Sequence, residues 1–556
     1  KESSWTRLLS KSDRYAKEKL AASLENLKAL YQNDGYVRFA VDNAVLNISE
    51  DKSSVFIEVS LSEGEQYQFG EVNFLGKPTF ENNELKELVT FSPNEKYSQA
   101  KLDETTAALK SRYGNEGYYL AQVRPVPRIN DDTKVVDVDY FIDPARPIYV
   151  RRINFTGNIK TQDEVLRREM RQLEGALATS DKIQLSRTRL MRTGFFKAVN
   201  VDVKPVPNQP DQVDINYVVE EQPSGSSTIA AGYSQSGGVT FQLDLTQNNF
   251  MGTGNRVKAA LPRSETRDSY SLGYTDPYFT ENGVSQGLSA YYRETKYDDR
   301  NVSNYVTDSY GATLNYSYPV DETKRVSAGL NIDNTSVRGG RFLGISNVQQ
   351  IIDDGGTFEN FVNDDNEASG RTGFKNDYST YNLLFGWDYS TLDRPVFPTK
   401  GMSHTVDGTI GLGDSSYQKL VYRGNIYYPF YKDWVARGYT KLGYGNDLPF
   451  YENFYAGGYG SVRGYESSTL GPKSQAYYDA VNDPANQSFS AEEVGGNALV
   501  TFGSELILPM PFKGDWADQV RPVLFAEGGQ VFDTTDKEDR TFINPNDGTD
   551  TGVPLL

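Results

Sequence analysis

Beyond residue 223 the chain is dominated by segments in which apolar and polar residues alternate. A two-residue period puts every second side chain on the same face of an extended strand, so each segment predicts a β-strand with one apolar face. The apolar sets of three clear segments are Val239, Phe241, Leu243 and Leu245, then Tyr310, Ala312, Leu314, Tyr316 and Tyr318, and then Tyr381, Leu383, Phe385, Trp387 and Tyr389. Because such segments recur toward the end of the chain, we predict a large antiparallel β-structure.

Alternation alone would also fit one or two soluble β-sandwiches, but two further features favour a membrane-spanning barrel. The apolar sets carry aromatic residues at the strand ends, as do the girdles at the two interfaces of a transmembrane barrel. Short turns at 275–278 and 319–322 alternate with long polar connections at 341–376 and 466–494. Short turns at one rim and longer loops at the other are typical of such barrels. We therefore predict a transmembrane antiparallel β-barrel over residues 223–556.

Before residue 223 the pattern changes to a repeated unit. The segment Phe69–Gly76 is echoed at Val150–Gly157, and both contain the sequence Asn-Phe-x-Gly. A glycine followed by an aromatic residue recurs at Gly35, Gly117 and Gly194. Related segments at similar spacing indicate copies of one supersecondary unit.

The order of elements within the unit follows from the residues around these glycines. Helical patterns precede them at 15–31, 100–113 and 183–191, and alternating segments follow at 55–61, 135–141 and 213–219. The unit predicts strand, helix, helix, strand, strand, with both helices on one face of a small mixed sheet. The first copy lacks its opening strand and first helix, so we expect Lys1 to fall inside a repeat.

The composition narrows the classes of function. Thirty-eight tyrosines and 49 glycines in 556 residues fit a β-rich chain. The sequence contains no run of 18 apolar residues, so it predicts no transmembrane helix. The formal net charge of −18 argues against nucleic acid as the main partner. There is no cysteine, and His404 is the only histidine, which leaves almost no basis for a metal cluster or a Ser-His-Asp triad. We predict no cofactor, no metal site and no enzyme activity.

One segment late in the chain carries a family resemblance. Val462-Arg463-Gly464-Tyr465 resembles the loop motif of the outer-membrane assembly and secretion superfamily, whose members join periplasmic POTRA domains to a sixteen-stranded barrel. The blocks that resemble the assembly-factor branch of this superfamily are Tyr451–Gly458, Val462–Lys473, Leu392–Gly401, Val165–Gly175, Asp276–Phe279 and Val494–Ala498. An isolated Arg-Gly-Tyr would be a weak match, whereas these blocks, in the family's order over nearly the whole chain, are specific.

The resemblance implies how the chain is divided. Residues 1–68 would be a partial third POTRA domain, 69–146 the fourth, 147–222 the fifth and 223–556 the outer-membrane β-barrel. About fourteen of the family's sixteen strands are expected, since the segment 521–532 is the last that the pattern supports. Relative to the family, we therefore expect a chain truncated at both ends.

The resemblance also implies a location and a function. The barrel is expected in the outer membrane and the POTRA domains in the periplasm, as the central component of the machinery that folds and inserts outer-membrane β-barrel proteins. The expected partners are unfolded outer-membrane protein clients, accessory lipoproteins of the assembly complex, periplasmic chaperones and the lipid bilayer, and no nucleic acid.

Three other functions compete with this insertase. A related secretion pore or autotransporter-assembly factor would lack the Glu-Asn-Phe-Tyr-Ala-Gly-Gly and Leu-Gly-Pro-Lys flanks of the loop motif. A barrel protease or phospholipase needs a base beside its nucleophile, and His404 is the only imidazole. A passive porin leaves the repeats and the loop motif unexplained.

The first barrel strand is a candidate seam. Around 228–234 it is short and rich in small residues, and its candidate seam positions are Ile229, Ala231, Gly232 and Tyr233. Unpaired backbone groups in hydrocarbon cost several kcal/mol each, so an insertase could lend its own strand edge to a client. The glycine could instead only let the barrel bend. The resemblance favours a weakly paired seam, formed in a complete chain against the final strand.

Arg463 is the second candidate. A guanidinium inside a barrel lumen needs an anionic partner, although a loop arginine could also be simply solvated. The resemblance matches the family's inner-wall acids to Glu505 and Glu527. Alternation places Glu505 on the lumen face, opposite the set Ala498, Val500, Phe502 and Leu506, whereas Glu527 shares its parity with apolar neighbours and stays ambiguous.

A charge pair in the last repeat is the third candidate. Arg167 and Glu174 lie seven positions apart on the predicted first helix of that repeat, and hence on one face. An ordinary solvated pair is one interpretation. The resemblance implies the other, which is docking of an accessory lipoprotein.

Overall fold

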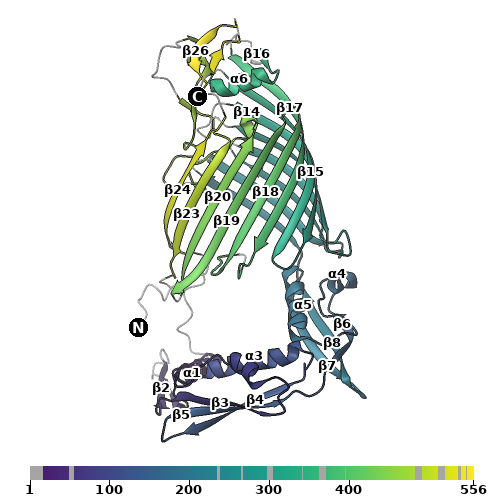
Figure 1. Ribbon diagram of the computed structural model, residues 1–556, viewed down its shortest axis with the longest axis vertical. Coiled ribbons are helices and arrows are strands. Elements are labelled where there is room, and N and C mark those ends of the chain that lie inside the picture. Colours follow the sequence, from purple (N-terminus) through teal and green to yellow (C-terminus); the bar gives the residue numbers. More distant parts are fainter. Residues whose placement is uncertain are drawn as a thin grey trace. The chain divides into compact units, whose positions relative to one another are not determined.

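The computed structural model divides into two compact units, Lys1–Gln222 and Pro223–Leu556 (Figure 1). The described residues are 17–48, 55–234, 238–264, 267–296, 305–340, 342–361, 371–394, 396–431, 433–482, 491–510, 520–535, 540–545 and 548–555. The surroundings of Lys1 and the start of the helix predicted from residue 15 lie outside these ranges. No helix of the described residues is both long enough and apolar enough to cross a membrane.

The N-terminal unit contains two complete copies of the predicted repeat. Its elements are α1 (Lys17–Asn33), β1 (Ala40–Ile48), β2 (Val55–Ser62), β3 (Gln68–Gly76), α2 (Asn82–Glu87), α3 (Gln99–Asn115), β4 (Gln122–Asn130), β5 (Val135–Asp143), β6 (Tyr149–Thr156), α4 (Asp163–Arg167), α5 (Ser180–Arg192), β7 (Phe196–Val206) and β8 (Gln209–Glu221). The strand orders β3-β5-β4 and β6-β8-β7 each combine one parallel and one antiparallel pair. The predicted order of elements and the mixed sheet are therefore confirmed in these two copies.

Each complete repeat has its own apolar core between sheet and helices. In the last repeat, Val213, Ile215 and Tyr217 of β8 are fully buried, as alternate positions of a strand should be. Ile183 and Leu190 of α5 pack against them, because residues seven apart share one helix face. Burial of the apolar side chains of both elements stabilises the repeat.

The repeated Asn-Phe-x-Gly sequence ends strands β3 and β6. Gly76 and Gly157 adopt positive φ angles of 94° and 93°. A side chain at Gly157 would collide with the carbonyl oxygen of Val219, and one at Gly76 would collide with that of Ile142. Both glycines are needed because the chain leaves each strand in a left-handed conformation directly against the neighbouring parallel strand.

Gly157→Ala is expected to destabilise the last repeat by about 2–4 kcal/mol, since left-handed backbone and steric overlap each cost about 1–2 kcal/mol or more. Hydrogen exchange of the β6 and β8 amides in the full chain measures the loss. Gly175→Ala is the matched control, because Gly175 also has a positive φ, 76°, but nothing lies within 4 Å of an added Cβ. Equal effects at the two positions would contradict the steric part of the argument.

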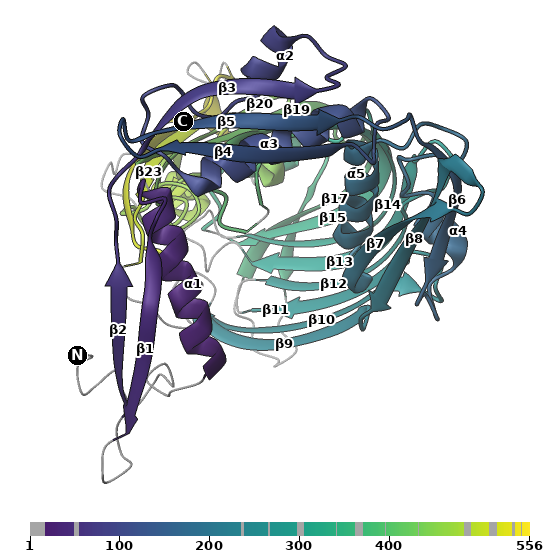
Figure 2. The ribbon, with the colours of Figure 1, turned by 90° about the horizontal axis from the view of Figure 1, so that it is seen from below.

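The second unit is one large antiparallel sheet. Its strands are β9 (Gly225–Ser234), β10 (Gly238–Phe250), β11 (Asn255–Arg263), β12 (Arg267–Asp276), β13 (Ser285–Lys296), β14 (Tyr305–Pro319), β15 (Lys324–Gly340), β16 (Thr357–Phe361), β17 (Arg371–Ser390), β18 (Gly401–Gly413), β19 (Tyr417–Tyr431), β20 (Trp434–Asn446), β23 (Ala498–Ile507) and β24 (Val523–Phe532). Within the described residues the sheet has 14 strands, 13 of them in sequence order from β9 to β24 and the fourteenth, β16, as a side branch on β17. Figure 2 shows the sheet curling round on itself.

The outer face of this sheet is apolar and exposed. Phe241, Leu330 and Phe385, from three different strands, have exposed fractions of 59%, 54% and 51%. A soluble sandwich would bury such a face, whereas a transmembrane barrel presents it to lipid. The predicted barrel with about fourteen strands is confirmed, and the sandwich interpretation is wrong.

The long connections are more structured than the polar pattern predicts. Within 341–376 lies α6 (Ile345–Asp353), and β17 already begins at Arg371. The other short elements beyond β20 are η3 (Phe450–Glu452), β21 (Lys473–Gln475), α7 (Tyr477–Asn482), β22 (Ala491–Glu493), β25 (Thr541–Ile543) and β26 (Asp550–Pro554). One apolar face of α6 packs on Phe542 and Leu555, so the loops build a small core of their own. The polar pattern of these connections therefore does not reveal the short helices and strands that they contain.

Candidate functional site

Strands β20, β23 and β24 present a row of polar side chains on the face opposite the exposed apolar one. Glu505 lies across from Arg437 on one side and from Phe525 on the other. Gly503 likewise lies between Tyr439 and Glu527. Because directly opposed residues in antiparallel strands share a face, all of these point into the lumen.

The loop between β20 and β23 brings Arg463 onto this row. Arg463 Nη2 donates to Glu505 Oε1 at 2.6 Å, and Arg463 Nε donates to Glu527 Oε1 at 2.8 Å. The backbone N–H of Arg463 donates to Glu527 Oε2 at 2.7 Å. The guanidinium carbon lies 3.6 Å from the centroid of the Phe525 ring. One arginine is therefore held by two carboxylates and an aromatic face.

A second layer of contacts orients the two carboxylates. Arg437 Nη1 donates to Glu505 Oε2 at 2.9 Å, and the Tyr439 hydroxyl donates to Glu527. A side chain at Gly503 would collide with the Tyr439 ring, so this glycine makes room for the tyrosine. Two arginines and two glutamates balance in charge. The two glutamate side chains are well shielded from solvent, with Glu505 11% and Glu527 5% exposed, whereas the side chains of Arg437 and Arg463 are 28% and 24% exposed.

The structure thus brings together three of the residues singled out from the sequence, Arg463, Glu505 and Glu527. The face of Glu527 was ambiguous from the sequence because the apolar residue Phe525 shares it. In the structure Phe525 also faces the lumen, where its ring packs on the Arg463 guanidinium. Sequence reasoning missed Arg437 and Tyr439. Alternation along β20 places these two on one face and is the signal that could have found them.

The remaining residues of the loop motif have different environments. Val462 is buried, with 2% of its surface exposed, whereas Tyr465 is exposed. Gly464 has a φ of 91°, in the region that favours glycine, and nothing lies within 4 Å of an added Cβ. Backbone conformation therefore accounts for this glycine.

The candidate seam residues lie on β9, away from the Arg463 site in the order of strands. Within the described residues β9 has one neighbour, β10, with Ala231 opposite Phe241 and Gly232 opposite Thr240. Ile229 is 85% exposed and belongs to the apolar outer face. No described contact joins β9 to Arg463.

The helix predicted to carry both Arg167 and Glu174 is shorter than expected. Helix α4 ends at Arg167, and the amides of Arg168 to Met170 complete its last turn. The Ser186 hydroxyl then accepts hydrogen bonds from the backbone amides of Arg171 and Gln172, which would otherwise continue the helix. Glu174 lies beyond the helix, so the prediction of a shared helical face is wrong. The two side chains still meet, with Arg167 Nη1 3.5 Å from Glu174 Oε1, and each is about half exposed.

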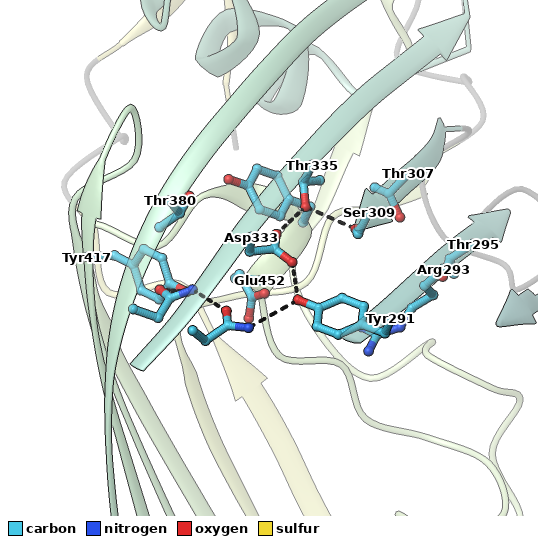
Figure 3. A pocket seen from close by; sticks show the side chains of 13 residues that line it. Tyr291, Arg293, Thr295, Thr307, Ser309, Asp333, Thr335, Thr380, Tyr417 and Glu452 are labelled. Atoms are coloured by element: carbon cyan, nitrogen blue, oxygen red, sulfur yellow. Dashed lines mark hydrogen bonds between the residues drawn. The ribbon is translucent and has the colours of Figure 1, made fainter. Parts of the chain in front are cut away.

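The lumen face of β13 to β19 carries a connected polar network around a cavity of about 300 Å³ (Figure 3). The Tyr417 hydroxyl donates to Asn382, and Asn382 donates to Asn331. Asn331 in turn donates to the Tyr291 hydroxyl, and the Tyr291 hydroxyl donates to Asp333.

Within the described residues, no group of three or more histidine or acidic side chains is arranged to hold a metal ion.

Comparison with known proteins identifies the class of protein that this fold and this loop define. The Omp85 superfamily domain matches residues 249–555, and the POTRA family, described as a surface antigen variable number repeat, matches 3–64, 67–145 and 148–222. The chain belongs to the Omp85 superfamily. It therefore lies in the outer membrane, with its POTRA repeats in the periplasm.

Several similar proteins carry one name, outer membrane protein assembly factor BamA. The chain is 32% identical over 551 residues to BamA of Neisseria meningitidis serogroup B, covering 97% of this chain and 66% of that protein. It is 30% identical over 354 residues to BamA of Buchnera aphidicola, covering 63% and 57%. The crystal structure of BamA from Haemophilus ducreyi lacking POTRA domains 1–3 has a TM-score of 0.60 and 30% identity, covering 84% of this chain and 88% of that one. The chain spans less than two thirds of the length of the first two relatives.

Proposed function

We propose that this chain forms the central part of an outer-membrane protein insertase, which folds β-barrel clients without forming or breaking covalent bonds. The observation that carries the proposal is the lumen loop fixed through Arg463 on Glu505 and Glu527, in an Omp85 chain whose relatives are named assembly factors. The loop would hold the barrel in a competent conformation. A related secretion pore is the second candidate function, and the Glu-Asn-Phe-Tyr-Ala-Gly-Gly and Leu-Gly-Pro-Lys flanks of the loop motif favour the insertase over it.

The physical task of an insertase is to pair a client's backbone before the client enters lipid. Each unsatisfied backbone group in hydrocarbon costs several kcal/mol, so a strand edge that accepts the client lowers the barrier to insertion. Strand β9 suits this role because Ala231 and Gly232 offer little side-chain packing to a competing neighbour strand. We propose β9 as one side of a lateral seam that opens to the client.

The N-terminal unit would receive partners in the periplasm. We propose that its three repeats are the third, fourth and fifth POTRA domains, over residues 1–68, 69–146 and 147–222. Their sheet edges suit extended, unfolded clients, which periplasmic chaperones would deliver. The half-exposed pair Arg167 and Glu174 is proposed as a docking point for an accessory lipoprotein.

Reconstitution in liposomes tests the function. Vesicles that contain the protein are expected to fold an unfolded outer-membrane client faster than protein-free vesicles do. A covalent lock between its first and last barrel strands is expected to abolish the acceleration. Acceleration that survives the lock would contradict the seam and indicate general destabilisation of the bilayer. No acceleration at all would contradict an insertase that acts without accessory subunits.

A further inference from the structure

The loop that carries Arg463 has a second attachment to the barrel wall. Its residues Glu452–Ala456 come from the Glu-Asn-Phe-Tyr-Ala-Gly-Gly block, which the Arg463 contacts do not explain. Arg463 contacts β23 and β24, whereas Glu452 contacts β19 and also borders the polar cavity in Figure 3. Glu452 and Arg463, two points along the same loop, are therefore held by different strands.

Lys419 of β19 makes the contacts to this segment. Its ammonium donates to the backbone carbonyl of Glu452 at 2.8 Å and to Glu452 Oε2 at 2.7 Å. The same nitrogen lies 5.0 Å from the centroid of the Phe454 ring. An ammonium has three donors and attracts an aromatic face, so one lysine satisfies three groups of a single loop segment. The lysine side chain is only 20% exposed.

The neighbouring strand β20 is shaped to receive the segment. A Cβ added at Gly443 would lie 2.7 Å from the Phe454 ring, and one at Gly445 would collide with Leu448. Gly445 lies directly across from Lys419 in the sheet. Two glycines on the same face therefore leave room for the loop, which a larger side chain would displace.

The segment also joins the outgoing and returning arms of the loop. The Phe454 N–H donates to the Gly496 carbonyl at 2.8 Å, and the Gly496 N–H donates back at 3.1 Å. Asn453 Nδ2 and the Tyr455 hydroxyl both donate to the Val494 carbonyl, at 3.0 and 3.2 Å. Residues Glu452–Ala456 and Val494–Gly496 thus form a cross-braced loop base, from which the segment with Arg463 extends.

We propose that Lys419 is a positioning residue, which fixes the loop base on β19 and so keeps Arg463 within reach of Glu505 and Glu527. Two attachments joined by a short segment raise each other's effective concentration, so loss of the base contact weakens the tip contact. The inference concerns how the loop is held. Its link to client insertion rests on the proposed function.

Cysteine labelling of the full chain in vesicles tests the proposal, because the chain has no cysteine of its own. Ala456→Cys reports on the loop base and Val462→Cys on the tip, since Ala456 is 1% exposed and Val462 is 2% exposed. Lys419→Met is expected to raise the maleimide labelling rate at both positions by about fivefold or more, as for a lost charge-assisted contact. Lys441→Met is the matched control, a lysine on the lumen face of β20 with no ion pair among the described residues, and should change neither rate.

The outcomes separate the possibilities. A rise at Ala456→Cys alone would overturn the claim that the base positions the tip, and no rise at either reporter would overturn the anchor itself. Lys419→Arg, which keeps a cation with several donors, is expected to restore slow labelling, and failure to restore it would overturn a role for the charge. Glu452→Gln weakens the same contact from the loop side and leaves β19 intact. It is expected to raise both labelling rates in the same direction as Lys419→Met, and it replaces that variant as the test if Lys419→Met folds poorly. Labelling as expected without any client insertion by the wild type would refute the proposed function and leave the anchor standing.

Discussion

Arg463→Ala is expected to slow client insertion by about tenfold or more while the barrel still folds. The substitution leaves Glu527, which is 5% exposed, without its cation, and breaking a buried ion pair typically costs about 3–5 kcal/mol. The loop would then leave the lumen wall more often. Insertion rates in reconstituted vesicles give the measurement, and heat-modifiable mobility on gels checks that the barrel has formed.

Glu505→Ala is expected to slow client insertion less than Arg463→Ala does. In this variant Arg463 keeps its side-chain and backbone hydrogen bonds to Glu527. Arg463→Lys should resemble the alanine variant, since an ammonium cannot reach two carboxylates in the planar geometry of a guanidinium. Equal insertion rates for the wild type and Arg463→Ala would remove the loop from the mechanism.

A cysteine at Gly232 is expected to form a disulfide with a cysteine in the terminal strand of a client during insertion. Paired strands lie roughly 5 Å apart, within the range that a disulfide spans. An added Cβ at Gly232 meets one atom within 4 Å, the Thr240 hydroxyl at 3.2 Å, so the substitution should be tolerated. Non-reducing gels of stalled client complexes detect the adduct.

Gly287→Cys on β13 is the matched control for the seam. An added Cβ there is also tolerated, with one contact at 3.8 Å, but β13 is paired on both sides, with β12 and β14. No adduct is expected at this position. Productive insertion with no adduct at Gly232, or with equal adducts at both glycines, would count against edge pairing at β9.

The strands and repeats are predictable from the sequence because their signals are local. Alternation of apolar and polar residues needs no knowledge of the partner strand, so β10, β14 and β17 all fall where the pattern places them. The same rule assigns Glu505 to the lumen face. The glycines of the Asn-Phe-x-Gly motif are visible as a repeat, although their reason, a collision with a neighbouring strand, appears only in three dimensions.

The errors have a common cause in contacts from distant residues. Helix α4 ends early because Ser186, on another helix, binds the amides that would continue it. The long connection after β15 contains α6 because apolar residues near the C-terminal end of the described chain give the helix a surface to pack on. Neither partner can be identified from the pattern of the segment itself.

By itself the sequence determines the order of elements, the faces of the strands with clear alternation and the family, because these depend on period and on contiguous motifs. The family resemblance points to Glu505 and Glu527, but only the tertiary structure decides that both hold Arg463, since they lie 42 and 64 positions away along the chain. The same holds for Lys419, whose partner Glu452 is 33 positions away. An ion pair depends on a few ångströms in space, and the register of the strands and the path of the loop set that distance.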